Sequence, residues 1–292
     1  MNDRPVVVGV DGSEESLRAV EWAAREAQRH HAPLRIVSAA AMPPRMRAHH
    51  GSTETVADLL QEASARAVSE ATARAGEVAP DLFVDADLLS GAPATAVTDS
   101  GSGALMLVVG ARGAGRFAAM LLGSVGRYAA GHAPCPVIVV REEVNAVQDE
   151  IAVGVRHPDD AARTLAFAFE EAVLRNAALV AVHSWHWFSA AFSGAGRDGA
   201  GNSAYREQVA AEASASLAEA LSGLREKYPA VQVRQVVVHD HPAKALAWYS
   251  AHADLVVIGR REAAGTGLGV GAVRDGLLSH SRGPVAVVPA QA

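Results

Sequence analysis

Short apolar runs and longer amphipathic segments alternate along the first half of the chain. The apolar runs predict buried strands, and the segments between them carry apolar residues at helical spacing. The expected strands span residues 5–10, 34–40, 82–89, 105–110 and 137–140. The expected helices span residues 13–30 and 53–75, a short stretch after Pro93, and residues 124–132. Strands joined by crossover helices predict a parallel sheet covered on both faces.

The second half repeats this pattern at an offset of about 145 to 149 residues. The matching apolar segments are 6–10 with 151–155, 104–112 with 254–260, and 135–141 with 283–289. A repeat of this length indicates a duplicated domain rather than a solenoid. We expect domain 1 to span 1–143 and domain 2 to span 150–292, joined by a polar connection.

One stretch combines a buried strand, a glycine-rich loop and the start of a helix. The strand ends at Gly110, more glycines follow at 113, 115 and 123, and Ser124 opens the helix. Glycine backbone approaches a ligand closely, and the N-terminus of a helix directs N–H groups at an anion. Arg112 and Arg116 add positive charge. The alternative is an ordinary connection, in which Ser124 merely caps the helix.

The spacing of this stretch excludes two common phosphate-binding motifs. No Gly-Lys-Ser/Thr follows, as a Walker A loop requires, and the dinucleotide fingerprint does not fit. Two residues separate Gly110 from Gly113, and nine residues separate Gly113 from the pair Gly123-Ser124. This spacing resembles the nucleotide-binding signature of the universal stress protein family. The resemblance implies two tandem doubly wound α/β domains of the adenine nucleotide alpha hydrolase-like fold. Each would be a five-stranded parallel sheet, in the order 3-2-1-4-5, with helices on both faces.

The same resemblance implies which residues bind a nucleotide. An aspartate matching Asp11 contacts the ribose or the metal-bound phosphates, and a backbone position matching Ala39 contacts the adenine. The phosphates of ATP, with Mg²⁺ as counter-ion, would lie on the loop and helix start. These positions are Gly110, Arg112, Gly113, Gly115, Gly123, Ser124 and Val125. The alternative for Asp11 is that it or Ser13 only caps the first helix.

The second half departs from the signature where nucleotide chemistry is expected. Arg156 corresponds to Asp11, Glu262 stands where Gly113 would be, and Ala272 has lost the hydroxyl of Ser124. A carboxylate beside a triphosphate repels it unless a cation intervenes. We therefore expect domain 2 to bind ATP weakly or not at all.

The composition of the chain limits the classes of partner that we expect it to bind. Half of the residues are apolar, 20% are charged and the formal net charge is −6, which is typical of a globular protein without a nucleic-acid surface. No leader segment or apolar run of membrane-spanning length is present, so we expect a cytoplasmic protein without a membrane partner. The single cysteine, Cys135, excludes an internal disulfide, and we expect it to be buried and structural.

Several polar groups invite other interpretations. The segments His183–His186 and His239–His241 lack metal-site spacing, so we expect no metal site there, and His183 should be hydrogen-bonded near a strand end. Trp185, Trp187 and Phe188 are expected to pack beneath a loop. Histidine pairs at 30–31 and 49–50, and acidic pairs at 14–15, 142–143 and 170–171, predict solvated charge.

The function that fits these observations is an ATP-binding regulator in a stress response. The last strands of the two halves, 137–140 and 285–288, are apolar throughout, and we expect them to pair the halves as an intramolecular pseudo-dimer. A homodimer and an unidentified regulatory protein partner stay open as further possibilities. The sequence leaves two alternative functions. The first is a slow ATPase or phosphoryl-transfer enzyme, for which no base is evident and no catalytic residue is assigned. The second is an interaction module whose nucleotide sites are vestigial. It does not distinguish ATP, ADP, AMP and cyclic AMP.

Overall fold

A computed structural model of the chain describes residues 2–40, 53–113, 122–141, 148–156, 161–185, 203–260 and 271–290. Contacts between residues divide the chain into two compact units, 1–142 and 143–290. In the part of the chain that the structure describes, every helix is too short or too polar to cross a membrane. The pairing of the two halves as a pseudo-dimer stays a prediction.

The first unit is a five-stranded parallel sheet in the order β3-β2-β1-β4-β5. Its elements are β1 (Val6–Gly9), α1 (Glu14–Arg29), β2 (Leu34–Ala40), α2 (Thr53–Val78), β3 (Val84–Ser90), α3 (Pro93–Asp99), β4 (Met106–Gly110), α4 (Ser124–His132) and β5 (Val137–Val140). The strand order implied by the family resemblance is thereby confirmed.

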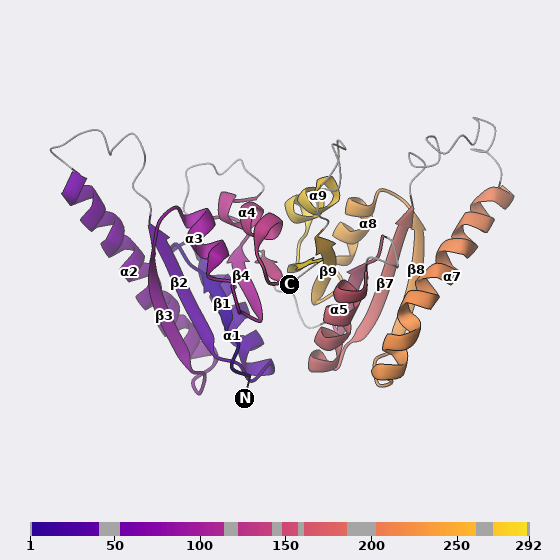
Figure 1. The fold of residues 1–292 in the computed structure, drawn as a ribbon, viewed down its shortest axis with the longest axis horizontal. Coiled ribbons are helices and arrows are strands. Elements are labelled where there is room, and N and C mark those ends of the chain that lie inside the picture. Colours follow the sequence, from indigo (N-terminus) through magenta and orange to yellow (C-terminus); the bar gives the residue numbers. More distant parts are fainter. Residues whose placement is uncertain are drawn as a thin grey trace. The chain divides into compact units, whose positions relative to one another are not determined.

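Two helices cover each face of this sheet. Helix α1 packs beside α2 on one face, and α3 packs beside α4 on the other (Figure 1). Strands β1, β4 and β5 are buried almost throughout, which explains why they are continuous apolar runs rather than alternating ones. Cys135 is buried, as predicted, beneath the turn at Gly101.

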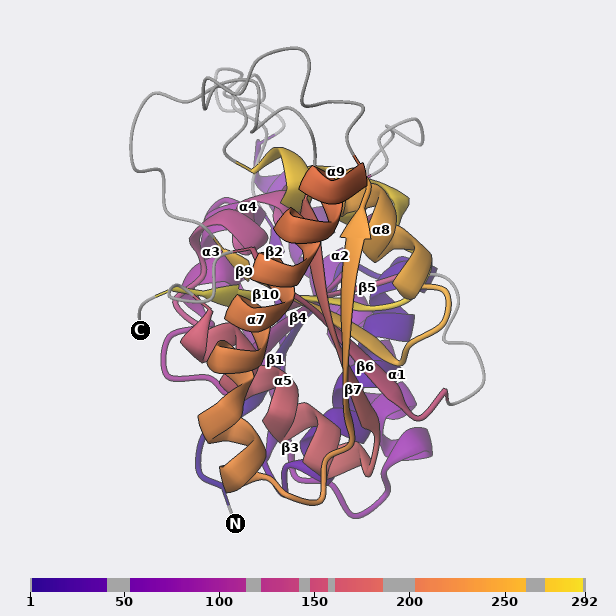
Figure 2. The same cartoon turned by 90° about the vertical axis from the view of Figure 1, so that its right-hand side faces the viewer.

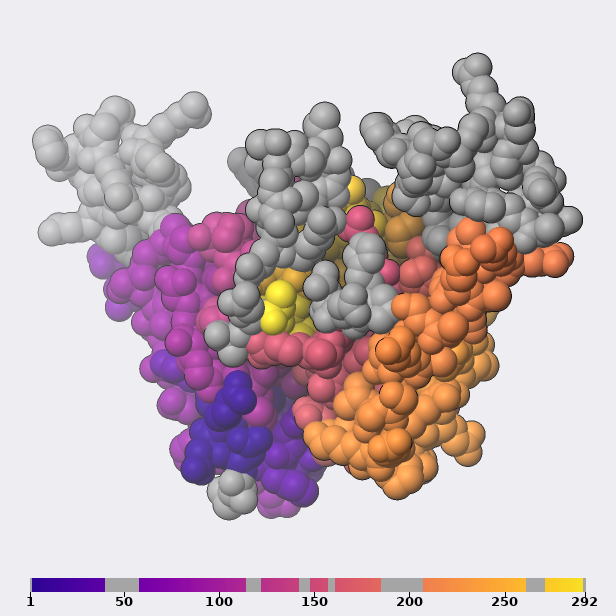
Figure 3. Space-filling view, turned by 45° about the vertical axis from the view of Figure 1, so that its right-hand side comes forward, coloured from indigo at the N-terminus to yellow at the C-terminus, as the bar shows by residue number. Residues whose placement is uncertain are grey.

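The second unit has the same architecture, with the strand order β8-β7-β6-β9-β10. Its elements are β6 (Glu150–Gly154), α5 (Ala162–Arg175), β7 (Ala178–Trp185), α7 (Ser203–Lys227), β8 (Val233–His239), α8 (Pro242–Tyr249), β9 (Leu255–Arg260), α9 (Ala272–His280) and β10 (Val285–Pro289). Figure 2 shows α5 and α7 beside the strands, and in Figure 3 side chains of α7 form much of this unit's outer surface. The predicted fold, two tandem doubly wound domains, is confirmed.

In a parallel sheet of this order, β2 and β3 are added on one side of β1, and β4 and β5 on the other, so the strand order reverses between β1 and β4. Ligands of open α/β sheets bind at the carboxyl ends of the strands beside such a switch point. Asp11 follows β1 and Arg112 follows β4, and the two strands pair with Gly9 opposite Val109. The first unit therefore brings its signature residues to the edge where a ligand is expected.

Candidate nucleotide-binding site

Asp11 holds the loop between β1 and α1. Its Oδ1 atom accepts hydrogen bonds from the backbone N–H of Ser13 at 3.1 Å and from the Ser13 hydroxyl at 2.6 Å. The Ser13 hydroxyl oxygen in turn accepts from the N–H of Ser16 at 3.2 Å, so Ser13 is the cap of α1. Asp11 is thus not the cap itself, and its carboxylate is exposed at the sheet edge.

The other oxygen of Asp11 faces the glycine loop. A Cβ atom added to Gly113 would lie 2.3 Å from Asp11 Oδ2, a distance at which one group must move. A Cβ added to Gly110 would lie 2.9 Å from the backbone oxygen of Glu15 in the first turn of α1. Both glycines are therefore explained by close approach of the two loops.

The start of α4 differs from the start of α1, which the Ser13 side chain caps. The helix begins at Ser124, and its N-cap is Gly123, which has no side chain with which to cap it. Ser124 is exposed and Val125 is partly buried. The capping role considered for Ser124 is not what the structure shows, and the first N–H groups of α4 lack partners within the helix.

Gly123 lies over the end of β4. Its N–H donates to the carbonyl of Ala111 at 2.7 Å. Its backbone is extended, with φ −67° and ψ 159°, a conformation open to any residue. Within the part of the chain that the structure describes, the atom nearest to a Cβ added there is the Ala111 oxygen at 3.5 Å. In contrast to Gly113, the fold itself does not require glycine at 123.

Arg112 supplies positive charge between these two loops. Its Nη2 atom lies 3.5 Å from Glu15 Oε1, and both side chains are partly exposed. Such a pair contributes little to stability, about 0 to 1 kcal/mol. Glu15 was not among the predicted site residues, and only its place in the first turn of α1 could have indicated it.

The proposed adenine contact lies on the neighbouring strand. The N–H of Val10 donates to the carbonyl of Val37 at 2.9 Å, and Ala39 follows two residues later in β2. Ala39 therefore lies at the same sheet edge as Asp11. Gly115 and Arg116 fall outside the described residues, as do the loop at 43–52 and the histidines in it.

The corresponding edge of the second unit has other side chains. Helix α9 begins at Ala272 after Gly271, as the alignment of the two halves predicts. Gly271 has φ 90°, which favours glycine, and Arg274 Nη2 would lie 3.0 Å from a Cβ at this position. Arg274 Nε donates to Asp275 Oδ1 at 2.8 Å, so a carboxylate of the chain itself lies in the first turn. Arg156 is exposed after β6, and Glu262 falls outside the described residues.

His183 of the second unit makes a hydrogen bond near the end of a strand. His183 Nδ1 lies 2.9 Å from the carbonyl oxygen of Val155, as predicted for a position near a strand end. Within either unit, no three described carboxylate, histidine or cysteine side chains bring ligand atoms within 4.8 Å of one another. Trp185 ends β7, and Trp187 and Phe188 fall outside the described residues.

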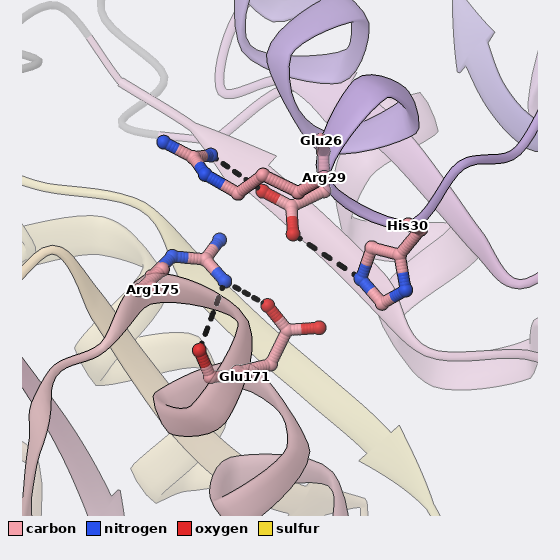
Figure 4. Close-up of polar contacts among 5 residues, drawn as sticks. All are labelled: Glu26, Arg29, His30, Glu171 and Arg175. Carbon is pink, nitrogen blue, oxygen red and sulfur yellow. Dashed lines mark hydrogen bonds and ion pairs between the residues drawn. The ribbon is translucent and has the colours of Figure 1, made fainter.

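Each unit also holds a buried carboxylate on its first helix, away from the strand ends (Figure 4). In α1, Glu26 accepts a hydrogen bond from Arg29 Nη1 at 3.0 Å and lies 3.3 Å from His30 Nε2. In α5, Glu171 pairs with Arg175 one turn later. The Glu26 and Glu171 side chains are 0% and 1% exposed.

The prediction of solvated charge at 170–171 is therefore wrong for Glu171, and that for His30 is wrong as well, because its side chain is 15% exposed. Burial of a carboxylate is unfavourable unless a cation compensates it, and Arg29 does so for Glu26 and Arg175 for Glu171, each from about one turn away. The repeat carries a signal that was overlooked: Glu26 and Glu171 lie 145 positions apart, the offset of β1 and β6.

Comparisons with known proteins agree with this architecture. The sequence profile of the Universal stress protein family matches residues 3–141 and again 149–289. The universal stress protein Rv2623 of Mycobacterium tuberculosis is 34% identical over 300 residues, covering 97% of this chain and 95% of that protein.

Two solved structures add to this. A universal stress protein from Archaeoglobus fulgidus superposes with a TM-score of 0.70 at 16% identity, covering 99% of this chain and 100% of that one, which shows the fold alone. Another universal stress protein, solved in complex with cAMP, is 29% identical over 47% of this chain and 96% of its own, with a TM-score of 0.37. Because the family profile matches both halves, this chain belongs to the universal stress protein family and carries the domain twice.

Proposed function

We propose that the first unit binds ATP with Mg²⁺ and that the protein acts as a nucleotide-dependent regulator in a stress response. The phosphates would lie against the start of α4 and the glycine loop, with the ribose or the metal-bound phosphates near Asp11. The adenine would contact the backbone at Ala39. In this proposal the nucleotide is bound as a signal, and its binding alters how the protein meets a partner.

The observation that carries this proposal is Gly123. Among the described residues the fold leaves room for a side chain there, because an added Cβ would make only an ordinary contact at 3.5 Å, and the backbone conformation suits any residue. A small residue before an uncapped helix N-terminus leaves space for an anion to approach the N–H groups. Glycine at this position therefore serves a ligand rather than the fold.

The charges of the loops support the same ligand. Arg112 is held near the loop by Glu15 at 3.5 Å, and a phosphate group competes well for a guanidinium held in a weak ion pair. Asp11 presents a carboxylate that suits either a ribose hydroxyl or Mg²⁺, which proteins bind through one or two carboxylates together with phosphate oxygens. Both assignments of Asp11 stay within the proposal.

The second unit lacks these features, and we propose that it does not hold ATP. Asp275 places a negative charge in the first turn of α9, where it is favoured by the helix dipole in place of a phosphate. Arg274 folds back towards Gly271, with its Nη2 atom 3.0 Å from the position of a Cβ there. The second unit would then act together with the first unit without binding ATP itself.

The experiment compares a substitution at each of the two helix starts. Gly123→Val fills the open space before α4, whereas Ala272→Val adds two carbon atoms at the exposed start of α9, one position after Gly271. We expect the wild-type protein to bind Mg²⁺-ATP, to release adenine nucleotide when denatured fresh from purification, and to lose binding on Gly123→Val alone. Equal unfolding midpoints of the nucleotide-free proteins are the control. A Gly123→Val variant that binds ATP normally would contradict the proposal.

A further inference from the structure

Two arginines follow neighbouring strands of the first unit, at the edge of the sheet where these strands end. Arg112 follows β4 after one residue, and Arg141 directly follows β5. The strands are parallel, with Gly110 opposite Val140, and the N–H of Ala111 donates to the Val140 carbonyl at 2.8 Å. Each arginine therefore follows a residue of this hydrogen-bonded pair.

Their surroundings disfavour two positive charges. Arg141 is partly buried, and its Nε atom is fully removed from solvent. Burial, and secondly the positive charge of Arg112, lower the pKa of the Arg141 guanidinium. An arginine nevertheless keeps its charge at neutral pH. An anion placed beside both groups would relieve this repulsion.

Arg112 borders the helix start where phosphates are proposed to bind. The Cα atom of Arg112 lies 3.6 Å from the position of a Cβ on Gly123, and the Ala111 carbonyl holds the Gly123 N–H. Guanidinium groups bind phosphate oxygens in a bidentate manner, and two of them match a group that carries several negative charges.

The second unit lacks one member of this pair. Val288 in β10 lies opposite Gly259 in β9, just as Val140 lies opposite Gly110, and the next residue is Pro289. Proline offers neither charge nor a hydrogen-bond donor. The arginine after the last strand is thus found in the unit whose nucleotide signature is intact.

We propose that Arg141 acts with Arg112 to select nucleotides by phosphate charge, so that the first unit binds ATP more tightly than ADP, and ADP more tightly than AMP or cAMP. The inference rests on the proposed function, since it assigns a residue to the phosphates of the same site. The adenosine contacts are common to all four ligands. Only the outer phosphates carry the charge that a second arginine would recognise.

The test measures the affinities of ATP, ADP, AMP and cAMP, with Mg²⁺, for four proteins. These are the wild type, Arg141→Gln, Arg141→Lys and Arg234→Gln, the last removing an exposed arginine that pairs with Glu150 in the second unit. We expect Arg141→Gln to weaken ATP about tenfold or more and AMP and cAMP less than about threefold. Arg141→Lys should keep part of the preference, and Arg234→Gln all of it.

The outcomes separate this inference from the proposed function. Equal losses for all four nucleotides would overturn it, because Arg141 would then only support the fold, and so would a wild type that binds ATP and AMP equally. A wild type that binds no nucleotide would overturn the proposed function itself.

If Arg141→Gln does not fold, the test is a competition experiment in which inorganic anions displace ATP from the wild-type protein. Inorganic triphosphate should displace ATP at concentrations where inorganic phosphate does not. Equal potency of the two anions would overturn the inference.

Discussion

The two units share a scaffold and differ at one sheet edge. Both place a glycine before the helix that follows the fourth strand, at Gly123 and at Gly271, but the residues around these glycines differ in charge. Neither helix start has a side-chain cap, but in the second unit an acid and an arginine of the chain, Asp275 and Arg274, pair in the first turn.

This difference shows which positions the fold needs and which serve a ligand. The last strand of each half, β5 or β10, stays apolar and buried because helices cover both faces of the sheet there, whereas the outermost strands β3 and β8 are partly exposed. Gly271 is needed for its positive φ, while Gly123 is not needed by the backbone at all. A duplicated chain thus contains its own control, as when Asp11 is compared with Arg156 at the equivalent position of the second unit.

The largest effect expected concerns a feature that both units share. Arg175→Met would leave Glu171 buried without its partner on α5, and breaking a buried ion pair costs about 3 kcal/mol. Urea unfolding of the nucleotide-free protein measures the change in the free energy of unfolding. Arg66→Met, which breaks the exposed Arg66–Glu62 pair of α2, is the control and should change nothing measurable.

The explanation of this effect can itself be checked. Replacing both partners, as Glu171→Leu with Arg175→Met, should recover most of the stability because no uncompensated charge is left. A double variant as unstable as Arg175→Met would show that packing rather than charge is responsible.

The next effect concerns the contact between the two loops of the first unit. Gly113→Ala places a Cβ 2.3 Å from Asp11 Oδ2, so the Asp11 carboxylate must turn away from its position beside the glycine loop. We expect ATP affinity to fall about 30-fold, or about 2 kcal/mol. Gly223→Ala, in α7 where an added Cβ meets nothing within 4 Å, is the control and should not change ATP affinity. Normal ATP binding by Gly113→Ala would show that this contact does not shape the site.

A smaller effect is expected when the charge of Asp11 is removed. Asp11→Asn keeps an acceptor for Ser13 but loses the attraction for Mg²⁺, so Mg²⁺-ATP should bind about tenfold more weakly while metal-free AMP changes less. Titration of both nucleotides measures this. Arg156→Gln alters the equivalent position of the second unit and should leave both affinities as they are. Equal losses for both nucleotides would instead assign Asp11 to the ribose.

The smallest effect is expected at the first residue of α4. Ser124→Ala removes one neutral hydrogen bond to phosphate but keeps the helix N–H groups, so ATP should bind about three- to fivefold more weakly. Competition against a fluorescent ATP analogue is sensitive enough to detect this. A loss as large as that of Gly113→Ala would mean that the hydroxyl, rather than the backbone, holds the phosphates.

Much of the fold could be predicted from the sequence. Apolar runs such as 137–140 in the first half and 285–288 in the second define buried strands, and the repeat defines two similar units. The helix start at Ser124 and its counterpart at Ala272 also followed from the alignment of the halves. These features depend on local patterns, which a single sequence displays.

Contacts between distant residues could not be predicted in the same way. Helical spacing alone did not reveal that Glu171 is buried, since a charged pair on a helix is usually solvated. The contact of Gly113 with Asp11 and the pairing of Arg112 with Glu15 join residues about 100 positions apart in the sequence, and only the packing of β1 against β4 brings them together. Arg141 was overlooked for the same reason.

The central claim is that one unit of the pair binds ATP and the other does not. Calorimetric titration of the full-length, nucleotide-free protein with Mg²⁺-ATP tests it most directly, because the stoichiometry counts the working sites. We expect one ATP per chain, with binding abolished by Gly123→Val and unchanged by Ala272→Val. Two ATP molecules per chain, or a single site lost on Ala272→Val instead, would contradict the account.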